Sequence, residues 1–374
     1  MPQLTIVIPT LNRLELMKRA LDSALAQTAE IDVIVSDNGS SDGTADYLAS
    51  LDLPSHVRRF RHETTMPIQE HVAFQFDQVL TPWSVFLSDD DYLEPRFAER
   101  VLALIELQPD VNLVYTGCGV IYGDIVAPAK VGPTVEEAAD FFLGFMEGGR
   151  HICLCATAFR MADLRAVGRQ PTSVVIGDMY YWTRILAPGG LVGCVDERLS
   201  NYTFYRPKRS SETNRTSVDA WVRESVELAD RMSATVEARD PSQAARARRA
   251  RSRFLARTVS NQMTWNALAG WSRASMLRSL PHFIPLFGRD LMAAMQACAA
   301  AVLPRAVLER LMLLYASRLA RAAQGTPWPG PPPPRAIAPR RRSQSRPGSA
   351  LRRAGLLRRG SPSSCSAPSG SGYS

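Results

Sequence analysis

The fold is decided by the stretch Ile31-Asp32-Val33-Ile34-Val35-Ser36-Asp37-Asn38-Gly39-Ser40-Ser41-Asp42-Gly43-Thr44, in which an acidic loop directly follows a short apolar run. The same arrangement recurs in Trp83-Ser84-Val85-Phe86-Leu87-Ser88-Asp89-Asp90-Asp91-Tyr92. Both apolar runs are rich in Val, Ile, Phe and Trp, which is typical of strands buried in a sheet. Because ligands of an open parallel sheet bind beyond the carboxyl ends of its strands, the two acidic loops predict one shared site.

Strand and helix patterns alternate around these two loops. Residues 4–9 indicate a buried strand that ends at a proline, and residues 14–27 carry apolar side chains at helical spacing. The later elements expected are a strand at 31–36, a short helix at 44–51, a strand at 56–62, a helix at 67–80 and a helix that begins at Pro95. Such alternation predicts an α/β fold with a mostly parallel sheet and right-handed connections.

The alternation ends near residue 116. Around and beyond it we expect a strand at 112–116, a loop at 117–134, a helix at 135–147, a strand at 152–159, a helix at 177–187 and one or two closing strands at 191–205. Residues 215–321 have a helical pattern, which predicts a helical C-terminal extension. The Pro-, Arg-, Ser- and Gly-rich residues after 324 predict a disordered tail, because they cannot bury enough apolar surface to fold.

The net charge of +8 belongs to this tail. Nine of the 44 Lys and Arg residues lie at 325–374, where there is no Asp or Glu, so residues 1–324 carry 35 basic and 36 acidic side chains. A nucleic-acid-binding domain needs positive charge on its folded surface, so binding of nucleic acid by the folded part is not expected. The Arg- and Ala-rich segment at 244–251 indicates either a solvated helix face or a contact with acidic lipid headgroups.

Several features predict a cytoplasmic protein, with peripheral contact to the inner face of the cell membrane as a further option. The six cysteines form no C-x-x-C pair, and Cys153 and Cys155 are expected to be small buried residues, which fits a reducing compartment. The first residues lack the basic region and the long apolar segment of a signal peptide. No run in the sequence reaches the roughly 20 apolar residues needed to cross a bilayer.

The acidic loops indicate a cation site. Carboxylates without clustered His or Cys favour a hard cation such as Mg²⁺ or Mn²⁺, which most often serves a phosphate substrate. Asp89, Asp90 and Asp91 repel one another, and a bound cation would offset that repulsion. Plain surface turns are the alternative for both loops. A calcium loop of the EF-hand type does not fit, because the twelfth position from Asp37 is Leu48 and not Glu.

Four motifs in this order resemble the family-2 glycosyltransferases, which have the GT-A fold. The motifs are Val7-Ile8-Pro9-Thr10-Leu11-Asn12-Arg13, Ser36-Asp37-Asn38-Gly39-Ser40-Ser41-Asp42-Gly43-Thr44, Phe86-Leu87-Ser88-Asp89-Asp90-Asp91-Tyr92-Leu93-Glu94-Pro95 and Ile176-Gly177-Asp178 with the aromatic helix that follows. The resemblance covers residues 3 to about 206. It implies a Rossmann-like GT-A sheet flanked by helices, a nucleotide-sugar donor, a divalent cation (Mn²⁺ or Mg²⁺) and inversion at the anomeric carbon. Two stretches depart from the pattern: the family often has Asp at the position of Ser36, and Asp-Ser-Asp-Asp where this chain has Ser88-Asp89-Asp90-Asp91.

The resemblance also implies roles for single residues. Asp178 would be the general base, Asp37 would accept a hydrogen bond from the nucleotide base, and Asp89 and Asp91 would hold the metal, with Asp90 an equally defensible ligand. The substrate-binding residues implied are Pro9, Thr10, Asn12, Arg13, Asp37, Gly39, Ser40, Asp89, Asp90 and Trp182.

Sugar transfer needs these residue types for physical reasons. A cation offsets the charge that builds on the departing diphosphate, and a base takes the proton of the incoming hydroxyl group. A single base on the acceptor side gives inversion, whereas a glycosidase needs a second carboxyl group. Asp178 lies at a predicted helix start, so capping of that helix is its alternative role.

Other side chains are weaker candidates. Tyr180, Tyr181 and Trp182 indicate either a platform for the acceptor or a core-facing aromatic cluster. His71 and His151 are expected near the site, where a lone histidine beside apolar residues more often has a structural role.

We therefore predict four regions: nucleotide-sugar binding at 1–116, acceptor binding and the catalytic base at 117–206, a helical extension at 207–324 and a disordered tail at 325–374. The expected acceptor is a saccharide or a lipid-linked glycan of the cell envelope, with peripheral contact to acidic membrane lipids as a further option. Two alternatives stay open. A sugar-phosphate nucleotidyltransferase shares the sheet but has a glycine-rich opening that this chain lacks, and a non-catalytic protein would bind nucleic acid or membrane through its Arg-rich tail.

Overall fold

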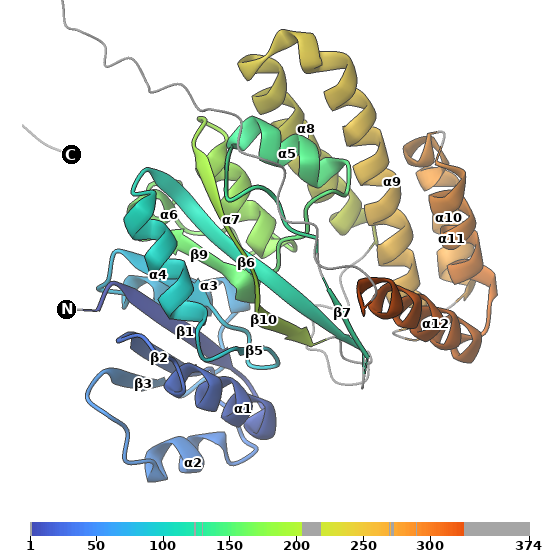
Figure 1. The fold of residues 1–374 in the computed structure, drawn as a ribbon. Helices are drawn as coiled ribbons and strands as arrows, with labels where there is room; N and C mark the ends of the chain where they lie inside the picture. The colour runs from blue at the N-terminus through green and yellow to red at the C-terminus, as the bar shows by residue number, and fades with distance from the viewer. Residues whose placement is uncertain are drawn as a thin grey trace, which may run out of the picture. The chain divides into compact units, whose positions relative to one another are not determined.

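The computed structural model describes residues 2–122, 125–128, 130–203, 218–268, 270, 273–288 and 290–324 (Figure 1). The tail at 325–374, for which disorder is expected, lies outside these described residues. The strands are β1 Leu4–Thr10, β2 Asp32–Asp37, β3 Val57–Arg61, β4 Trp83–Phe86, β5 Tyr92–Leu93, β6 Val111–Tyr122, β7 Ile125–Pro128, β8 Val135–Glu137, β9 Thr157–Arg160 and β10 Leu191–Thr203. The α-helices are α1 Leu14–Leu25, α2 Thr44–Ser50, α3 Ile68–Asp77, α4 Phe97–Leu107, α5 Ala138–Met146, α6 Met161–Val167, α7 Gly177–Leu186, α8 Val218–Arg239, α9 Ala244–Leu268, α10 Arg273–Phe287, α11 Leu291–Val302 and α12 Arg305–Gln324.

The described strands form one sheet in the order β3-β2-β1-β4-β9-β6-β10-β5, with β7 beside β6 and β8 beside β10. The first half, β3-β2-β1-β4, pairs in parallel, as the strand-helix alternation predicts. β9 then lies between β4 and β6 and runs antiparallel to both. β10 pairs in parallel with β6 but antiparallel with β5 and β8, so the sheet is mixed and not mostly parallel.

β6 continues to Tyr122, through a segment for which a loop is expected. Gly117 lies inside this strand, where a Cβ atom would stand only 2.7 Å from the carbonyl oxygen of Glu197 in β10. A glycine inside a strand often marks such a close backbone approach, so the glycines here serve packing and not a turn.

Two neighbouring elements also begin differently from the sequence expectation. β8 takes the first residues of the helix expected at 135–147, because Val135 to Glu137 pair with β10. The 3₁₀ turn Leu154–Ala156 shortens the strand expected at 152–159 to β9. Cys153 and Cys155 are buried, as expected, although they flank and occupy this turn and do not lie on a strand.

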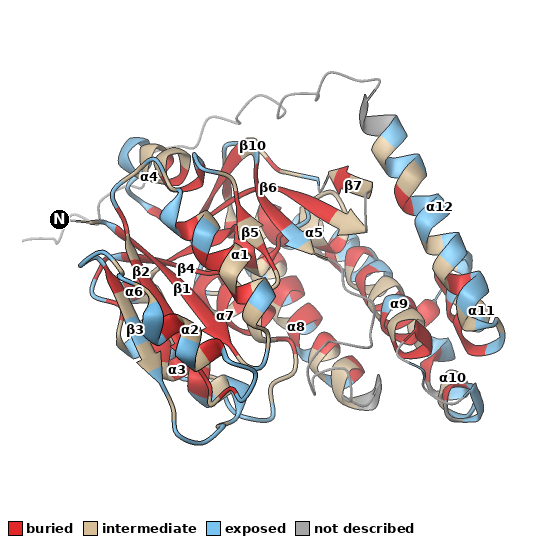
Figure 2. Cartoon of the chain, turned by 90° about the horizontal axis from the view of Figure 1, so that it is seen from below, coloured by how far each residue is buried: buried red, intermediate tan, exposed pale blue. Residues whose placement is uncertain are grey.

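Side chains alternate between the two faces of the sheet and build two cores. Figure 2 marks the buried residues in red along the central strands. On β1, Val7 belongs to one core, and Ile6 and Ile8 belong to the other, as the two-residue period of a strand requires. Helices α1, α2 and α4 pack into the core of Ile6, whereas α3, α5, α6 and α7 pack into the core of Val7. The carboxyl end of the fully buried strand β1 is thus held between two layers.

The helical pattern of residues 215–321 corresponds to helices α8 to α12, which confirms the expected helical extension. Leu228 of α8 and Phe254 of α9 belong to the core that α5 and α7 cover, so these helices continue the α/β region. Met263 of α9, Phe283 of α10 and Ala297 of α11 belong to a third core. α12 lies beside β7 (Figure 1). None of the described helices is both long enough and apolar enough to cross a membrane.

Candidate active site

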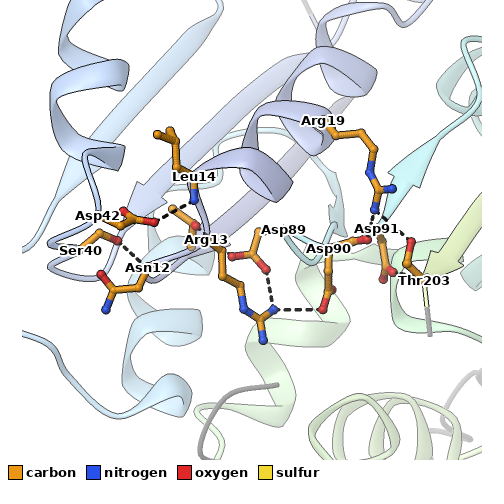
Figure 3. Close-up of polar contacts among 11 residues, drawn as sticks. Asn12, Arg13, Leu14, Arg19, Ser40, Asp42, Asp89, Asp90, Asp91 and Thr203 are labelled. Atoms are coloured by element: carbon orange, nitrogen blue, oxygen red, sulfur yellow. Dashed lines mark hydrogen bonds and ion pairs between the residues drawn. The ribbon is translucent and has the colours of Figure 1, made fainter. Parts of the chain in front are cut away.

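The loop after β1 and the first acidic loop are tied together by hydrogen bonds (Figure 3). Asn12 has a φ of 53°, a left-handed conformation that Asn tolerates better than most residues. Its backbone nitrogen donates to Oγ of Ser40 at 2.8 Å, and its Oδ1 accepts from the backbone nitrogen of Ser41 at 2.7 Å. Oδ2 of Asp42 accepts from the backbone nitrogen of Leu14 at 2.9 Å, so the acidic loop caps α1.

Asp37, at the end of β2, is fully buried beside this junction. Its Oδ1 accepts a hydrogen bond from the backbone nitrogen of Ser40 at 2.9 Å, whereas its Oδ2 has no hydrogen-bond partner among the described residues. Gly39 has a φ of +82°, and a Cβ atom there would stand 3.1 Å from the backbone nitrogen of Thr65. Pro9 pairs with Ser36 in the parallel register of β1 and β2. A buried acceptor without a partner is uncommon and indicates a place where a ligand can donate.

The second acidic loop follows β4 and faces the start of α1 (Figure 3). Oδ2 of Asp89 accepts from Oγ1 of Thr10 at 2.9 Å, and its Oδ1 accepts from Nη1 of Arg13 at 2.9 Å. The same nitrogen donates to Oδ2 of Asp90 at 3.0 Å. Burial raises the pKa of Asp89 to about 6, against the opposing effect of Arg13. The structure therefore brings Thr10 and Arg13 to the carboxylates of Asp89 and Asp90.

Asp91 has different surroundings from its two neighbours. Its Oδ1 accepts from the backbone nitrogen of Thr203 in β10 at 2.8 Å. Arg19 donates to the carbonyl oxygen of Asp90 and to Oγ1 of Thr203, which holds the loop to β10. Within the described residues, no Lys or Arg forms an ion pair with Asp91. Burial, followed by the charge of Asp90, raises its pKa well above the ordinary value.

A large cavity of 1430 Å³ adjoins this loop. Ser88 and Asp91 line it from the second acidic loop, and Asp178 lines it from the first turn of α7. The cavity thus combines residues from the second acidic loop and from α7, whereas no residue of the first acidic loop is among those that line it. Asp91 and Asp178 bring carboxylate oxygens to this cavity, and carboxylates can hold a cation or accept a proton.

Asp178 is held in place by the start of α7. Glu224 of α8 accepts from the backbone nitrogens of Val175 and Ile176, at 2.7 and 3.1 Å, and so anchors the residues before it. Ile176 occupies the cap position and makes no side-chain cap, while Oδ1 of Asp178 accepts from the backbone nitrogen of Met179 at 2.8 Å in the first turn. Burial raises the pKa of Asp178, which makes its carboxylate a better proton acceptor than an exposed aspartate.

The order of these residues along the sheet agrees with a known family. The family model described as Glycosyl transferase family 2 matches residues 5–167, which contain both acidic loops. The chain carries a family-2 glycosyltransferase domain.

Curated relatives of this glycosyltransferase domain come from several bacteria. An uncharacterized glycosyltransferase of Haemophilus influenzae is 31% identical over 113 residues, which are 30% of this chain and 37% of that protein. A PGL/p-HBAD biosynthesis glycosyltransferase of Mycobacterium bovis is 30% identical over 171 residues, which are 45% of this chain and 62% of that protein. The matches therefore span less than two thirds of the length of either relative.

Solved structures with a similar fold include TarS of S. aureus, with a TM-score of 0.53 at 16% identity, over 86% of this chain and 54% of the TarS chain. TarS 1–349 in complex with UDP-GlcNAc has a TM-score of 0.53 at 14% identity, over 84% of this chain and 92% of that chain. At these identities the likeness concerns the fold. The GT-A fold expected for the glycosyltransferase domain is confirmed.

Trp182 does not lie where a substrate-binding residue of the glycosyltransferase domain is expected. Its side chain is buried, with 1% exposure, and its ring centroid lies 4.9 Å from that of Phe145 and 5.7 Å from that of Phe141. Tyr181, in contrast, lines the cavity with Asp178. The helix turns Asp178 and Tyr181 toward the cavity, while α5 offers Trp182 an aromatic core, so the core-facing alternative holds for the tryptophan.

His71 and His151 also differ in their surroundings: one has a structural role and the other lines the cavity. His71 is buried, and its Nε2 lies 2.8 Å from Oγ of Ser36; burial, with His62 nearby, lowers its pKa to about 4. It is therefore a neutral structural histidine near neutral pH. His151 lines the cavity. Sequence reasoning missed the contributions of α9, α11 and α12 to this cavity, among them Trp265, Met295 and Tyr315. A helical apolar pattern alone does not tell which helix face meets a cavity.

Proposed function

We propose that the chain transfers a sugar from a nucleotide-diphosphate donor to a hydroxyl group of a saccharide or lipid-linked glycan, with a divalent cation and with Asp178 as the general base. The observation that carries this proposal is the shared cavity, which Asp91 lines from the acidic loop and Asp178 lines from α7. An acidic loop that holds the donor diphosphate and a carboxylate that meets the acceptor need to border the same space, because the two substrates react directly.

The donor site is proposed at the junction of the first acidic loop with the loop after β1. Oδ2 of Asp37 is buried and has no partner in the described part of the chain, which supports this placement because an N–H group of a nucleotide base can donate to it. Thr10, Asn12 and Ser40 shape the same junction. TarS 1–349, which shares the fold, is in complex with UDP-GlcNAc, and this supports a nucleotide-sugar as the class of donor. Arg13 is proposed to meet the donor diphosphate beside Asp89 and Asp90.

The acidic loop fits a divalent cation. Asp91 is a buried carboxylate that no described cation compensates, and Asp90 keeps 23% of its side chain exposed. Both oxygens of Asp89 already accept from Thr10 and Arg13. We therefore favour Asp91 with Asp90 as ligands, and Asp89 as a residue that positions Arg13. No described group of three or more His, Cys, Asp or Glu is arranged to hold a metal, which suits Mg²⁺ or Mn²⁺ bound by one or two carboxylates, water and phosphate.

The proposed base completes the chemistry. The acceptor oxygen forms a bond to the anomeric carbon while the bond from that carbon to the diphosphate oxygen breaks, and the carboxylate of Asp178 takes the proton of the hydroxyl group. The departing diphosphate keeps the electron pair of the broken bond, and a bound cation would offset its charge. Displacement with a single base gives inversion at the anomeric carbon. Glu224 holds the turn that carries Asp178 and is a positioning residue.

The membrane contact expected from the Arg-rich segment at 244–251 stays a prediction. Arg246 pairs with Glu147 and Arg251 pairs with Asp230, so these arginines already have acidic partners in the same chain, which favours the solvated-face interpretation. The cytoplasmic location also stays a prediction. Binding of nucleic acid or membrane through the tail concerns residues 325–374, which lie outside the described residues.

The test uses the full chain and a panel of UDP, GDP and dTDP, each with Mn²⁺, with Mg²⁺ or with a chelator. A nucleotide that binds only the native state raises the melting temperature by mass action. We expect one nucleotide to do so, only with metal, and we expect the metal-dependent shift to vanish in Asp90→Ala/Asp91→Ala. No shift with any nucleotide would argue against the donor site. A shift that survives the chelator and the double substitution would argue against the cation.

A further inference from the structure

The cavity that contains Asp91 and Asp178 has a further wall, which α11 and α12 supply. Its volume of 1430 Å³ exceeds the roughly 300–1000 Å³ of a typical ligand pocket. A donor at the acidic loops would therefore leave part of the cavity for a second molecule. The residues of the α11 and α12 wall indicate which chemical groups that second molecule carries.

Apart from Asp290 and Gln296, the residues of this wall are apolar. Met292 and Met295 of α11 and Leu311 and Tyr315 of α12 line the cavity, although 74%, 57%, 49% and 64% of their surfaces are exposed. Single exposed apolar residues are ordinary, whereas a cluster of them beside a cavity marks a binding surface. Methionine adapts its shape to irregular apolar ligands, which suits a flexible hydrocarbon.

The same two helices carry apolar residues that do not line the cavity. Leu291 is 71% exposed and directly precedes Met292, and Leu314 is 53% exposed and directly precedes Tyr315. Neither is among the residues that line the cavity. A flat bilayer or a second protein surface could contact these two leucines as readily as their neighbours. A hydrocarbon ligand enclosed in the cavity would contact only the residues that line it.

We propose that the α11 and α12 wall binds a hydrocarbon chain, and that the acceptor is an amphipathic molecule that joins a hydroxyl-bearing polar group to such a chain. The polar group would reach Asp178 while the chain lies against Met292, Met295, Leu311 and Tyr315. The continuity of the apolar wall with the space that Asp178 borders carries this inference. That the bound molecule is the acceptor of sugar transfer rests on the proposed function.

The experiment measures binding without nucleotide or metal. Methyl, hexyl and octyl β-D-glucopyranoside are titrated into the full chain by calorimetry, each below its critical micelle concentration. Each methylene group that leaves water completely adds about fourfold to affinity, so we expect the octyl compound to bind at least about tenfold more tightly than the methyl compound. Burial of the chain should also give a negative heat-capacity change.

Two double substitutions, at side chains of similar exposure, then show where the octyl group binds. Met292→Gln/Leu311→Gln is expected to weaken octyl binding about tenfold, because it makes the lining polar. Leu291→Gln/Leu314→Gln is expected to leave the octyl affinity within about twofold of the parent. All four side chains are at least 49% exposed, so both variants are expected to fold, and equal thermal unfolding midpoints check this.

Three results would overturn the inference. They are equal affinity for methyl and octyl compounds, no binding of any of them, and equal losses in the two double variants, which would indicate adsorption to an open apolar surface. Because the titration needs neither donor nor metal, octyl binding in a protein that no nucleotide stabilises would retain the hydrocarbon site and reject the transferase proposal. Nucleotide stabilisation without octyl binding would do the reverse.

Discussion

Nη1 of Arg13 lies 2.9 Å from Oδ1 of Asp89, so an arginine at the start of α1 neutralises the first carboxylate of the second acidic loop. Arg13 has 18% of its side chain exposed and Asp89 has 7%. Burial nevertheless raises the pKa of Asp89 to about 6. The arginine thus keeps a carboxylate charged at neutral pH in surroundings that favour its neutral form.

Replacing this arginine should destabilise the protein. Arg13→Gln leaves Asp89 buried without its cation, and we expect the free energy of unfolding at pH 8 to fall by on the order of 3 kcal/mol. The loss should shrink toward pH 5, because Asp89 is then largely protonated in the parent as well. Urea unfolding at both pH values measures the effect. In the control Arg96→Gln, which breaks an exposed pair with Glu99, the free energy of unfolding should change much less than in Arg13→Gln. Equal losses in the two variants would contradict the role assigned to burial.

Asp37 should determine nucleotide affinity. In Asp37→Asn the side-chain oxygen can still accept from the backbone nitrogen of Ser40, while the unpartnered carboxylate oxygen is lost. A hydrogen bond to a charged acceptor contributes about 1.5–3 kcal/mol, so we expect the dissociation constant for the preferred nucleotide to rise about 10- to 100-fold. Calorimetric titration measures it, and Asp46→Asn, at an exposed position of α2, is the control. Unchanged affinity would place the base of the nucleotide elsewhere.

Asp178 should affect turnover and leave nucleotide binding unchanged. We expect Asp178→Asn to lower kcat about 100- to 10,000-fold, because the amide cannot accept the proton of the acceptor. Asp77→Asn, at an exposed carboxylate of α3, should keep the parent rate. Turnover with the nucleotide-sugar of the preferred nucleotide measures both variants. Normal turnover of Asp178→Asn would assign the base to another group.

The same carboxylate should give the rate an acidic limb. Burial raises the pKa of Asp178 above its ordinary value of 3.8, and only the deprotonated form accepts a proton. We therefore expect kcat to fall as the pH drops through the raised pKa, so that the limb lies above pH 3.8. A pH profile of kcat checks this, and the limb should disappear from the residual activity of Asp178→Asn. If the parent and Asp178→Asn show the same acidic limb, the limb does not arise from Asp178.

His71 should make stability depend on pH. Its pKa in the folded protein is about 4, below its unfolded value of about 6.5, so folding favours the neutral ring. The contribution is complete above pH 6.5 and is lost as the pH falls toward 4; linkage gives a loss of about 2 kcal/mol by pH 5. His71→Gln should lack this loss, so the difference in unfolding free energy between parent and variant should change by about 2 kcal/mol between pH 7.5 and pH 5. A constant difference would contradict a neutral buried ring.

The pairing of the strands after residue 116 could not be predicted from the sequence. Gly117 and Gly119 indicate a loop when they are considered locally, yet both lie in β6. The close approach of Glu197 that requires a glycine at 117 comes from β10, some 80 positions later, and no local pattern carries that information.

The buried first strand, the two acidic loops at strand ends and the helical extension can be predicted from the sequence, because each depends on the spacing of apolar residues within one element. Only the tertiary structure decided that Arg13 pairs with Asp89, that Tyr181 faces the cavity while Trp182 enters the core, and that α11 and α12 border the space of Asp178. These relationships join segments far apart in the chain. An apolar period shows that a helix has a face to bury, whereas the surface that meets this face is set by the packing of the whole molecule.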